Sequence, residues 1–447
     1  MVGGLEDLDC SLKNLCTAAS TGAPYGKKFT ATHVAKCIAL LSSRWAAASS
    51  TSSSTLHAPV LDRLPAGAIV PEGWLLKQAH VQANGETGGL AVWLGGGIAE
   101  NCYMPFATGS VHAKCGMQGG EYFINGMFPL TAIIDVPALR DIRERSVGRI
   151  LRWTNGPNGT LMGEIPWTNR TNDNSDYWGR MIAVLALQTY VESVGPYAPN
   201  ATMKARVEAA LVRHYYAMYS QMSAEMPPFY LDAWGSARYV EILIGIQWML
   251  DRGHTDEMYF DLLRLVQGKS HQILGWEEWF RSGDPFADHT TDTIRCWGNK
   301  SDPTEREFQK HHGVNIMEAI KTGPVWSRVT GNASDLNNAE AALRFIDTNA
   351  YSSDGTMTAG DCLNVVVQPH DPTEGVETCA VVESMYSLRT SYEITGNPLF
   401  YDRLEHIAFN ALPLTTAKDF SGNCYYHMMN QGALLPPPPP HAARSSF

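Results

Sequence analysis

Long apolar runs and clusters of basic residues are both missing from this chain of 447 residues. No apolar run approaches the ~20 residues that a membrane-spanning helix needs, so the sequence predicts no transmembrane segment. No block is rich in lysine and arginine, and 34 basic residues against 45 acidic ones leave a net charge of −11. This balance argues against nucleic acids and anionic membrane surfaces as partners.

Closely spaced cysteine pairs are missing too. No two cysteines are separated by only two residues, which excludes zinc-ribbon and thioredoxin-type patterns. The nine are Cys10, Cys16, Cys37, Cys102, Cys115, Cys296, Cys362, Cys379 and Cys424. We expect most of them to be buried free thiols. The acidic start contains no clear signal peptide, whereas five N-x-S/T sequons favour secretion, so the compartment stays open.

Three common catalytic motifs are also absent. No G-x-S-x-G, P-loop or G-x-G-x-x-G occurs in a suitable context, which argues against serine hydrolase, nucleotide-binding and dinucleotide-binding functions.

What the chain does contain is 44% apolar and 18% charged residues, enough for a large buried core. Composition predicts three parts: an atypical, flexible leader (1–63), a folded domain (64–432) and a proline-rich disordered tail (433–447).

Helical periodicity dominates the folded part. Apolar residues recur every three or four positions in 177–194 and 203–222, and they cover most of the circumference of 237–253, where Gly253 marks the end. Further helices are predicted at 313–329, 335–347, 378–395 and 399–411, with one short strand at 363–369.

Two stretches share a local pattern of a helix end, a Thr-Gly-Asn turn and a new helix. They are RVTGNASDLNNAEAAL (328–343) and EITGNPLFYDRLEHIAF (393–409), with YVESVGPYAPNATMKARVEAAL (190–211) as a looser copy. Repeated helical hairpins bury their apolar faces by stacking. They form either an open superhelix or a ring. The many loop aromatics, which suit the flat faces of sugars, favour an all-α (α/α)6 barrel of the six-hairpin glycosidase type.

A carboxylate and a thiol lie one residue apart in EGVETCAVVESMYSL (374–388), where an apolar helical run begins. Residues two apart point to nearly opposite sides of a helix but to the same face of an extended segment. Glu377 and Cys379 therefore bind one ion together only if this entry is still extended. A thiolate and a carboxylate suit Zn²⁺, which takes four ligands. The ordinary alternative is a buried thiol with a glutamate in the first helical turn.

Other polar residues lie in suitable places for a site. Asp354, Asp361 and Cys362 belong to a glycine-containing loop, where carboxylates act as general acids or form turns. His312 begins a helix and can hydrogen-bond a sugar hydroxyl or cap the helix. Tyr122 and Trp178 are aromatic residues at predicted helix starts, suited to binding substrate or to ordinary packing.

The stretch 375–413, GVETCAVVESMYSLRTSYEITGNPLFYDRLEHIAFNALP, resembles the signature of glycoside hydrolase family 127, the β-L-arabinofuranosidase-like proteins. Four other stretches agree in order: LPAGAIVPEGWL, GGEYFINGMFPL, YWGRMIAVLALQTYVESVG and HGVNIMEAIKTGPVWSRVTGN. The resemblance covers residues 64 to 432. It implies a catalytic (α/α)6 barrel and a retaining exo-glycosidase that removes terminal L-arabinofuranose from a glycan.

The resemblance also implies a metal-assisted thiolate site. In that family a zinc ion holds a cysteine nucleophile, and the Glu and Cys of the E-x-C motif, here Glu377 and Cys379, are zinc ligands. Zinc keeps a thiol deprotonated at neutral pH. An upstream carboxylate protonates the leaving oxygen and then activates water.

Two features depart from the family pattern. The acid/base position falls on Asp361 or Cys362, where the family has a glutamate. The adjacent cysteine pair that supplies the nucleophile is not found, since Cys424 has no neighbouring cysteine. The alternatives are therefore an inactive or truncated relative that binds carbohydrate, and a helical scaffold for protein partners.

Overall fold

A computed structural model describes residues 55–93, 118–153, 177–223, 233–271, 274–284, 306–359, 363 and 375–428. Apart from Thr55, these belong to one compact unit that extends from Leu56 to Phe447. Residues 1–54 of the predicted leader, the predicted tail, Asp361, Cys362 and residues 364–369 of the predicted strand lie outside the described residues. The predicted domain boundaries stay predictions.

Helices make up nearly all of the regular structure. In chain order they are α3 (Gly73–Asn84), α4 (Glu86–Trp93), α7 (Gln118–Ile133), α8 (Pro137–Trp153), α9 (Trp178–Glu192), α10 (Ala201–Met222), α11 (Ala233–Ala237), α12 (Tyr239–Asp251), α13 (Glu257–His271), α14 (Trp276–Ser282), α15 (Arg306–His311), α16 (Gly313–Ala319), α17 (Thr322–Thr330), α18 (Ala333–Leu336), α19 (Asn338–Asn349), α20 (Thr378–Thr395), α21 (Pro398–Phe409) and α22 (Ala411–Leu414). Within the described ranges, the named strands are β1 (Val376–Glu377) and β2 (Tyr426–His427). No described helix is both long and apolar enough to cross a membrane.

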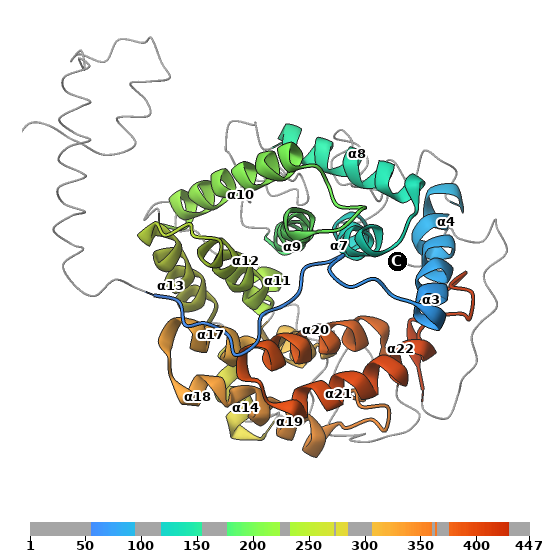
Figure 1. Cartoon of the computed structure of the whole chain (residues 1–447). Helices are drawn as coiled ribbons and strands as arrows, with labels where there is room; N and C mark the ends of the chain where they lie inside the picture. The colour runs from blue at the N-terminus through green and yellow to red at the C-terminus, as the bar shows by residue number, and fades with distance from the viewer. Residues whose placement is uncertain are drawn as a thin grey trace, which may run out of the picture. The chain divides into compact units, whose positions relative to one another are not determined.

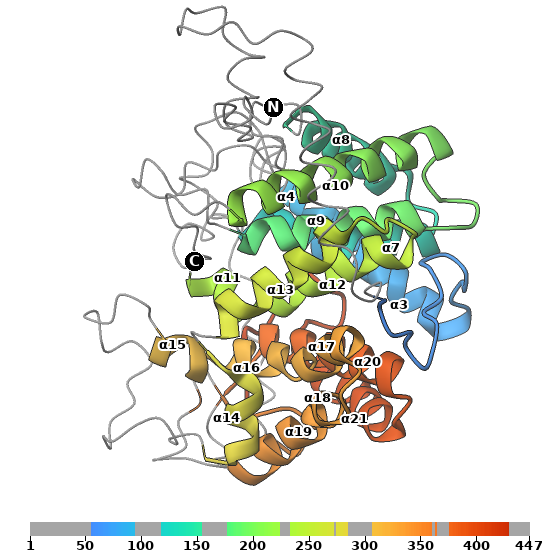
Figure 2. The ribbon, with the colours of Figure 1, turned by 90° about the vertical axis from the view of Figure 1, so that its left-hand side faces the viewer.

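The helices form two layers (Figure 1). In the inner layer α7 packs against α9, α9 against α12, α12 against α17, and α17 against α20. In the outer layer α8 covers α7, α10 covers α9, α13 covers α12, α19 covers α17, and α21 covers α20. In Figure 2, α10 runs above α9, and α13 lies beside α12. Each inner helix is thus paired with an outer one, and the prediction of an all-α barrel of helical hairpins is confirmed.

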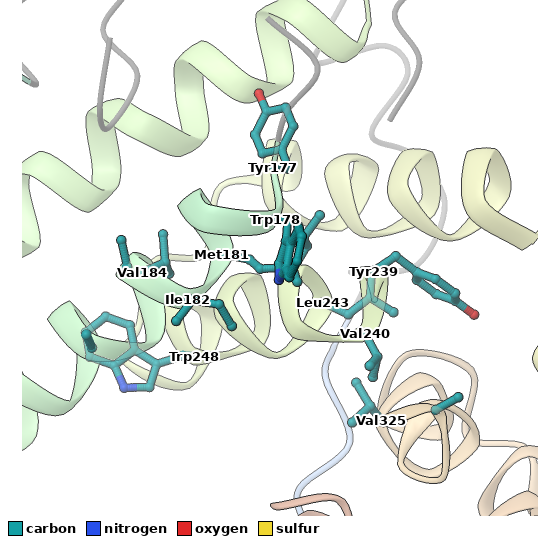
Figure 3. Close-up of a cluster of buried hydrophobic side chains, with 14 of the residues drawn as sticks. Tyr177, Trp178, Met181, Ile182, Val184, Tyr239, Val240, Leu243, Trp248 and Val325 are labelled. Atoms are coloured by element: carbon teal, nitrogen blue, oxygen red, sulfur yellow. The ribbon is translucent and has the colours of Figure 1, made fainter. Parts of the chain in front are cut away.

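The inner helices bury large apolar side chains against one another. Figure 3 shows Met181 and Ile182 of α9 facing Val240 and Leu243 of α12, with Val325 of α17 nearby. All five are at most 4% exposed. Complete burial of such a side chain stabilises the fold by about 1.5–3 kcal/mol. The apolar stripes that the sequence predicts are therefore the faces that join the inner layer.

Most predicted helices are confirmed, including those that became α9, α10, α12, α20 and α21. The single helix predicted at 313–329 is wrong, because the structure has α16 and α17 with a break at Ile320 and Lys321. Pro324 explains the break: proline has no N–H to donate to the carbonyl of Ile320. The helix predicted at 335–347 likewise corresponds to α18 and α19, which meet at Asn337.

The two Thr-Gly-Asn turns have the same backbone conformation. Gly331 and Gly396 follow α17 and α20 with φ values of 69° and 68°, which only glycine adopts without strain. An N-terminal segment runs across both helix ends: His57 N–H donates to the Arg328 carbonyl (2.7 Å), and Leu61 N–H donates to the Glu393 carbonyl (2.9 Å). This segment connects neighbouring hairpins of the inner layer.

Candidate functional site

Glu377 lies where a short strand becomes a helix. Strand β1 pairs antiparallel with β2, with Val376 opposite His427 and Glu377 opposite Tyr426. Glu377 is extended (φ −72°, ψ 134°), immediately precedes α20, and is 2% exposed. The extended entry is therefore confirmed for Glu377, whereas Cys379 already lies in the first turn of the helix.

Tyr425 brings Glu377 and Cys379 together across this strand–helix junction. Its hydroxyl donates a hydrogen bond to Glu377 Oε1 and lies 3.9 Å from Cys379 Sγ. The backbone next to it is fixed, because Thr378 N–H donates to the Tyr425 carbonyl (2.8 Å) and the Thr378 hydroxyl donates to the Cys424 carbonyl (2.8 Å). A carboxylate, a thiol and a phenol thus meet at one point.

The Cys379 side chain is exposed to solvent, but many protein atoms surround its thiol and exclude part of the water around it. Desolvation and, after it, the neighbouring Glu377 carboxylate raise the pKa of its thiol to about 12. The hydrogen bond with Tyr425 and the charge of Arg238 act in the opposite direction but are outweighed. With only protein groups around it, Cys379 is therefore a neutral thiol at pH 7 and a weak nucleophile.

Aromatic rings from α7, α9 and α11 gather around Arg238, the residue before α12. Trp178 of α9 and Trp234 of α11 stack with ring centroids 4.8 Å apart. The Arg238 guanidinium lies 4.7 Å from the Trp178 ring and 5.1 Å from the Trp234 ring. Tyr122 of α7 accepts hydrogen bonds from Trp178 Nε1 (3.0 Å) and Arg238 (2.9 Å). Two of the predicted substrate-binding residues, Tyr122 and Trp178, are therefore in direct contact.

His312, the third predicted substrate-binding residue, lies beside the same stack. Its ring meets that of Trp234 edge-on, with centroids 5.3 Å apart, and it precedes α16 as the N-terminal capping residue. It makes no side-chain cap hydrogen bond. Burial, together with the positive charge of Arg238, lowers its pKa to about 3. The imidazole is neutral at pH 7 and can both donate and accept a hydrogen bond.

Sequence reasoning missed three glutamates that meet in the interior. Carboxylate oxygens of Glu241, Glu318 and Glu383 all lie within 4.8 Å of one another. Lys321 Nζ lies 2.6 Å from Glu241, and Arg238 Nε lies 3.3 Å from Glu318. Burial raises the pKa of Glu318 and of Glu383. The three carboxylates come from α12, α16 and α20, so no local motif could reveal them.

Two sets of residues in the described ranges have donors that a metal ion accepts. The glutamate cluster is the one group of three or more His, Cys, Asp or Glu ligands found there, and it could hold a metal ion. The second set, Glu377 and Cys379, fits zinc in donor type, since carboxylate oxygen and thiolate sulfur are both zinc ligands. Within the described ranges no further His, Cys, Asp or Glu joins this pair.

Asp354 is the described member of the loop that also contains Asp361 and Cys362. It is buried, and its carboxylate lies 2.7 Å from His427 Nε2 and accepts a hydrogen bond from the Thr356 backbone (3.0 Å). Burial alone would raise its pKa, but the hydrogen bonds from His427 and Thr356 outweigh burial and lower it. Asp354 therefore anchors β2, which carries His427 and follows Tyr425 directly.

Comparisons with known proteins identify the fold. The chain matches no protein-family model, and no curated protein matches it in sequence. Among solved structures, it is similar to a glycoside hydrolase family 127 β-arabinofuranosidase, with a TM-score of 0.55 and 12% identity over 83% of this chain and 57% of the other. A family 127 β-L-arabinofuranosidase from Geobacillus stearothermophilus T6 gives a TM-score of 0.54 and 14% identity over 80% and 58%.

A third structure, described as a glycoside hydrolase, gives a TM-score of 0.53 and 13% identity, over 84% of this chain and 56% of the other. This chain thus spans less than two thirds of the length of these structures. At such low identity the likeness establishes a shared helical barrel-like fold.

Proposed function

We propose that this protein is a glycoside hydrolase of the β-L-arabinofuranosidase type. It removes terminal L-arabinofuranose, or a related sugar, from glycans or glycoproteins by a retaining mechanism. The likeness of its fold to family 127 structures supports this class. The observation that carries the proposal is the convergence of Glu377 and Cys379 on the Tyr425 hydroxyl, because the resemblance in sequence assigns those two residues to the reactive site.

Glu377 and Cys379 are the residues that would hold zinc. The bound ion would supply positive charge that keeps a coordinating thiol deprotonated. The protein alone does not do this, since the pKa of the Cys379 thiol is raised to about 12. The cysteine nucleophile that the resemblance implies is not assigned to a residue of this chain.

Asp361 is the proposed acid/base. In a retaining reaction such a carboxyl group first protonates the leaving glycosidic oxygen and then removes a proton from the attacking water. An aspartate is one methylene shorter than the glutamate of the family, so it requires a correspondingly closer approach of the substrate.

Tyr122, Trp178 and His312 are the proposed substrate-binding residues. Their contacts with Arg238 and Trp234 restrict the side-chain conformations of all three, which lowers the entropic cost of ordering them around a ligand. His312 is neutral at pH 7 and bonds a sugar hydroxyl without carrying a charge. Trp178 is 6% exposed, so it acts mainly by holding Trp234, Tyr122 and Arg238 in place.

The test is hydrolysis of an aryl β-L-arabinofuranoside by the purified full chain supplied with zinc. We expect release of the aryl alcohol, and a loss of at least about 100-fold in kcat/KM for Cys379→Ala and for Asp361→Asn. Cys424→Ala is the matched cysteine control and should retain activity.

The competing function is carbohydrate binding without turnover, which the neutral state of the Cys379 thiol favours. Calorimetric binding of L-arabinose by a chain that shows no hydrolysis would establish that alternative. Hydrolysis that is unchanged in Cys379→Ala would contradict the proposed site.

A further inference from the structure

We propose that the Tyr425 hydroxyl is a third protein ligand, beside Glu377 and Cys379, of the metal ion at this site. The inference rests on the metal site of the proposed function and extends it to a residue that the E-x-C motif does not contain. Its starting point is that the phenol oxygen already contacts both of the other donor groups.

The separations between the donors suit a tetrahedral ion. Zn–O bonds of about 2.0 Å and Zn–S bonds of about 2.3 Å at tetrahedral angles place an oxygen and a sulfur ligand roughly 3.5 Å apart. The Tyr425 hydroxyl lies 3.9 Å from Cys379 Sγ, so only a small movement separates the two arrangements. The hydrogen bond from Tyr425 holds its oxygen even closer to Glu377, and an ion between them would replace that bond.

The backbone holds Tyr425 in register with the other two donors. Its carbonyl accepts a hydrogen bond from Thr378 N–H, the residue between Glu377 and Cys379. Two residues further on, His427 bonds Asp354 at 2.7 Å and fixes the end of β2 from the buried side. The phenol is therefore presented by a segment attached to the E-x-C motif rather than by an independent loop.

Donor chemistry points to the same residue. A carboxylate and a thiolate leave a four-coordinate zinc ion two ligands short. Among His, Cys, Asp and Glu side chains in the described ranges, none forms a group of three with Glu377 and Cys379. The phenol would supply a further oxygen donor, and coordination would release the thiol and phenol protons to the buffer.

The buried glutamate cluster is the weaker of the two metal sites on electrostatic grounds. Two cations already lie against it, with Lys321 at 2.6 Å from Glu241 and Arg238 at 3.3 Å from Glu318. A divalent ion entering there would be repelled by both of these side chains at short range.

The experiment titrates the chelator-treated full chain with Co²⁺ alone and follows the near-ultraviolet sulfur-to-cobalt absorption, with Zn²⁺ competition measured by calorimetry. Wild-type protein should bind one ion, and Tyr425→Phe should bind at least about tenfold more weakly. Tyr426→Phe is the matched control, because the neighbouring phenol is opposite Glu377 in the sheet and its ring lies 4.7 Å from that of Tyr425. It should bind as wild type does.

Three results would overturn the inference: no cobalt binding by the wild-type chain, equal affinity in Tyr425→Phe, or binding that is lost in Glu241→Gln and retained in Cys379→Ser. Circular dichroism of each variant shows whether the protein is folded. The metal titration contains no glycoside, so it tests the Tyr425 ligand separately from the proposed hydrolase activity. Absence of hydrolysis would contradict the proposed function, whereas absence of metal binding would contradict this inference.

Discussion

At the scale of single residues, the candidate site is governed by side chains whose charge depends on their surroundings. Cys379 has a raised pKa because desolvation and the Glu377 carboxylate both disfavour its thiolate. His312 has a lowered pKa because burial and the Arg238 charge both disfavour its imidazolium. Both groups are therefore neutral at pH 7 when only the protein surrounds them.

The raised thiol pKa predicts slow alkylation of Cys379. An ordinary cysteine has a pKa of about 8.5, so at pH 9 most unfolded chains carry the thiolate. In the metal-free native protein, with a pKa of about 12, iodoacetamide should modify Cys379 slowly at pH 9 and faster as the pH rises towards 12. Peptide mapping by mass spectrometry measures the rate.

Glu377→Gln is the informative variant for this measurement. Removing the carboxylate lowers the thiol pKa, so alkylation at pH 9 should accelerate. Equal rates in the native and urea-unfolded wild-type chain would contradict the raised pKa.

At the scale of elements, the helix-ending turns determine how neighbouring hairpins join. Gly396 ends α20 with φ 68°, and Asn397 begins α21 by accepting a hydrogen bond from Leu399 N–H (3.0 Å). A Cβ atom at position 396 would also lie 2.8 Å from Val60 Cγ1, in the segment that crosses the turn. Both the backbone conformation and the packing therefore require glycine there.

Gly396→Ala should lower the free energy of unfolding by about 1–2 kcal/mol, because alanine is strained at positive φ. Gly126→Ala is the control: this glycine is exposed within α7, and a Cβ added there meets no atom within 4 Å. It should stabilise the helix by up to about 1 kcal/mol. Urea unfolding measures both changes, and equal effects of the two substitutions would rule out the special role of the turn.

At the scale of the whole folded unit, Arg328 connects elements that are far apart in the chain. Its guanidinium forms a two-point ion pair with Asp251 of α12 (2.7 and 3.0 Å) and donates to the His57 carbonyl (2.9 Å). The arginine is buried, although half of the Asp251 side chain is exposed, which weakens the ionic part through solvent screening. Arg328, itself on α17, thus joins the N-terminal segment to α12 and α17.

Arg328→Ala should reduce the free energy of unfolding by about 2–4 kcal/mol, chiefly through the hydrogen bonds of a buried charged group. Arg328→Lys should recover only part of the loss, since an ammonium cannot reproduce the planar two-point contact. Arg344→Ala removes an exposed ion pair with Glu340 on one helix and should change stability by less than about 0.5 kcal/mol. Urea midpoints compare the three variants, and an Arg328→Ala effect as small as that of Arg344→Ala would contradict this connecting role.

The helical hairpins were predictable from sequence because the apolar period, the glycine of each Thr-Gly-Asn turn and the next helix start are all encoded within about twenty residues. The break between α16 and α17 was predictable in principle as well, since Pro324 marks it. Glu377 and Cys379 were found because both belong to one short motif.

Only the tertiary structure placed Tyr425 against that motif, 48 residues after Glu377, and brought Glu241, Glu318 and Glu383 together from three separate helices. Local sequence determined the helices and their ends, because backbone hydrogen bonds and side-chain periodicity act between near neighbours. The tertiary structure decided which side chains share a site. Those contacts depend on how whole helices pack into the barrel, and this packing leaves no short-range pattern in the sequence.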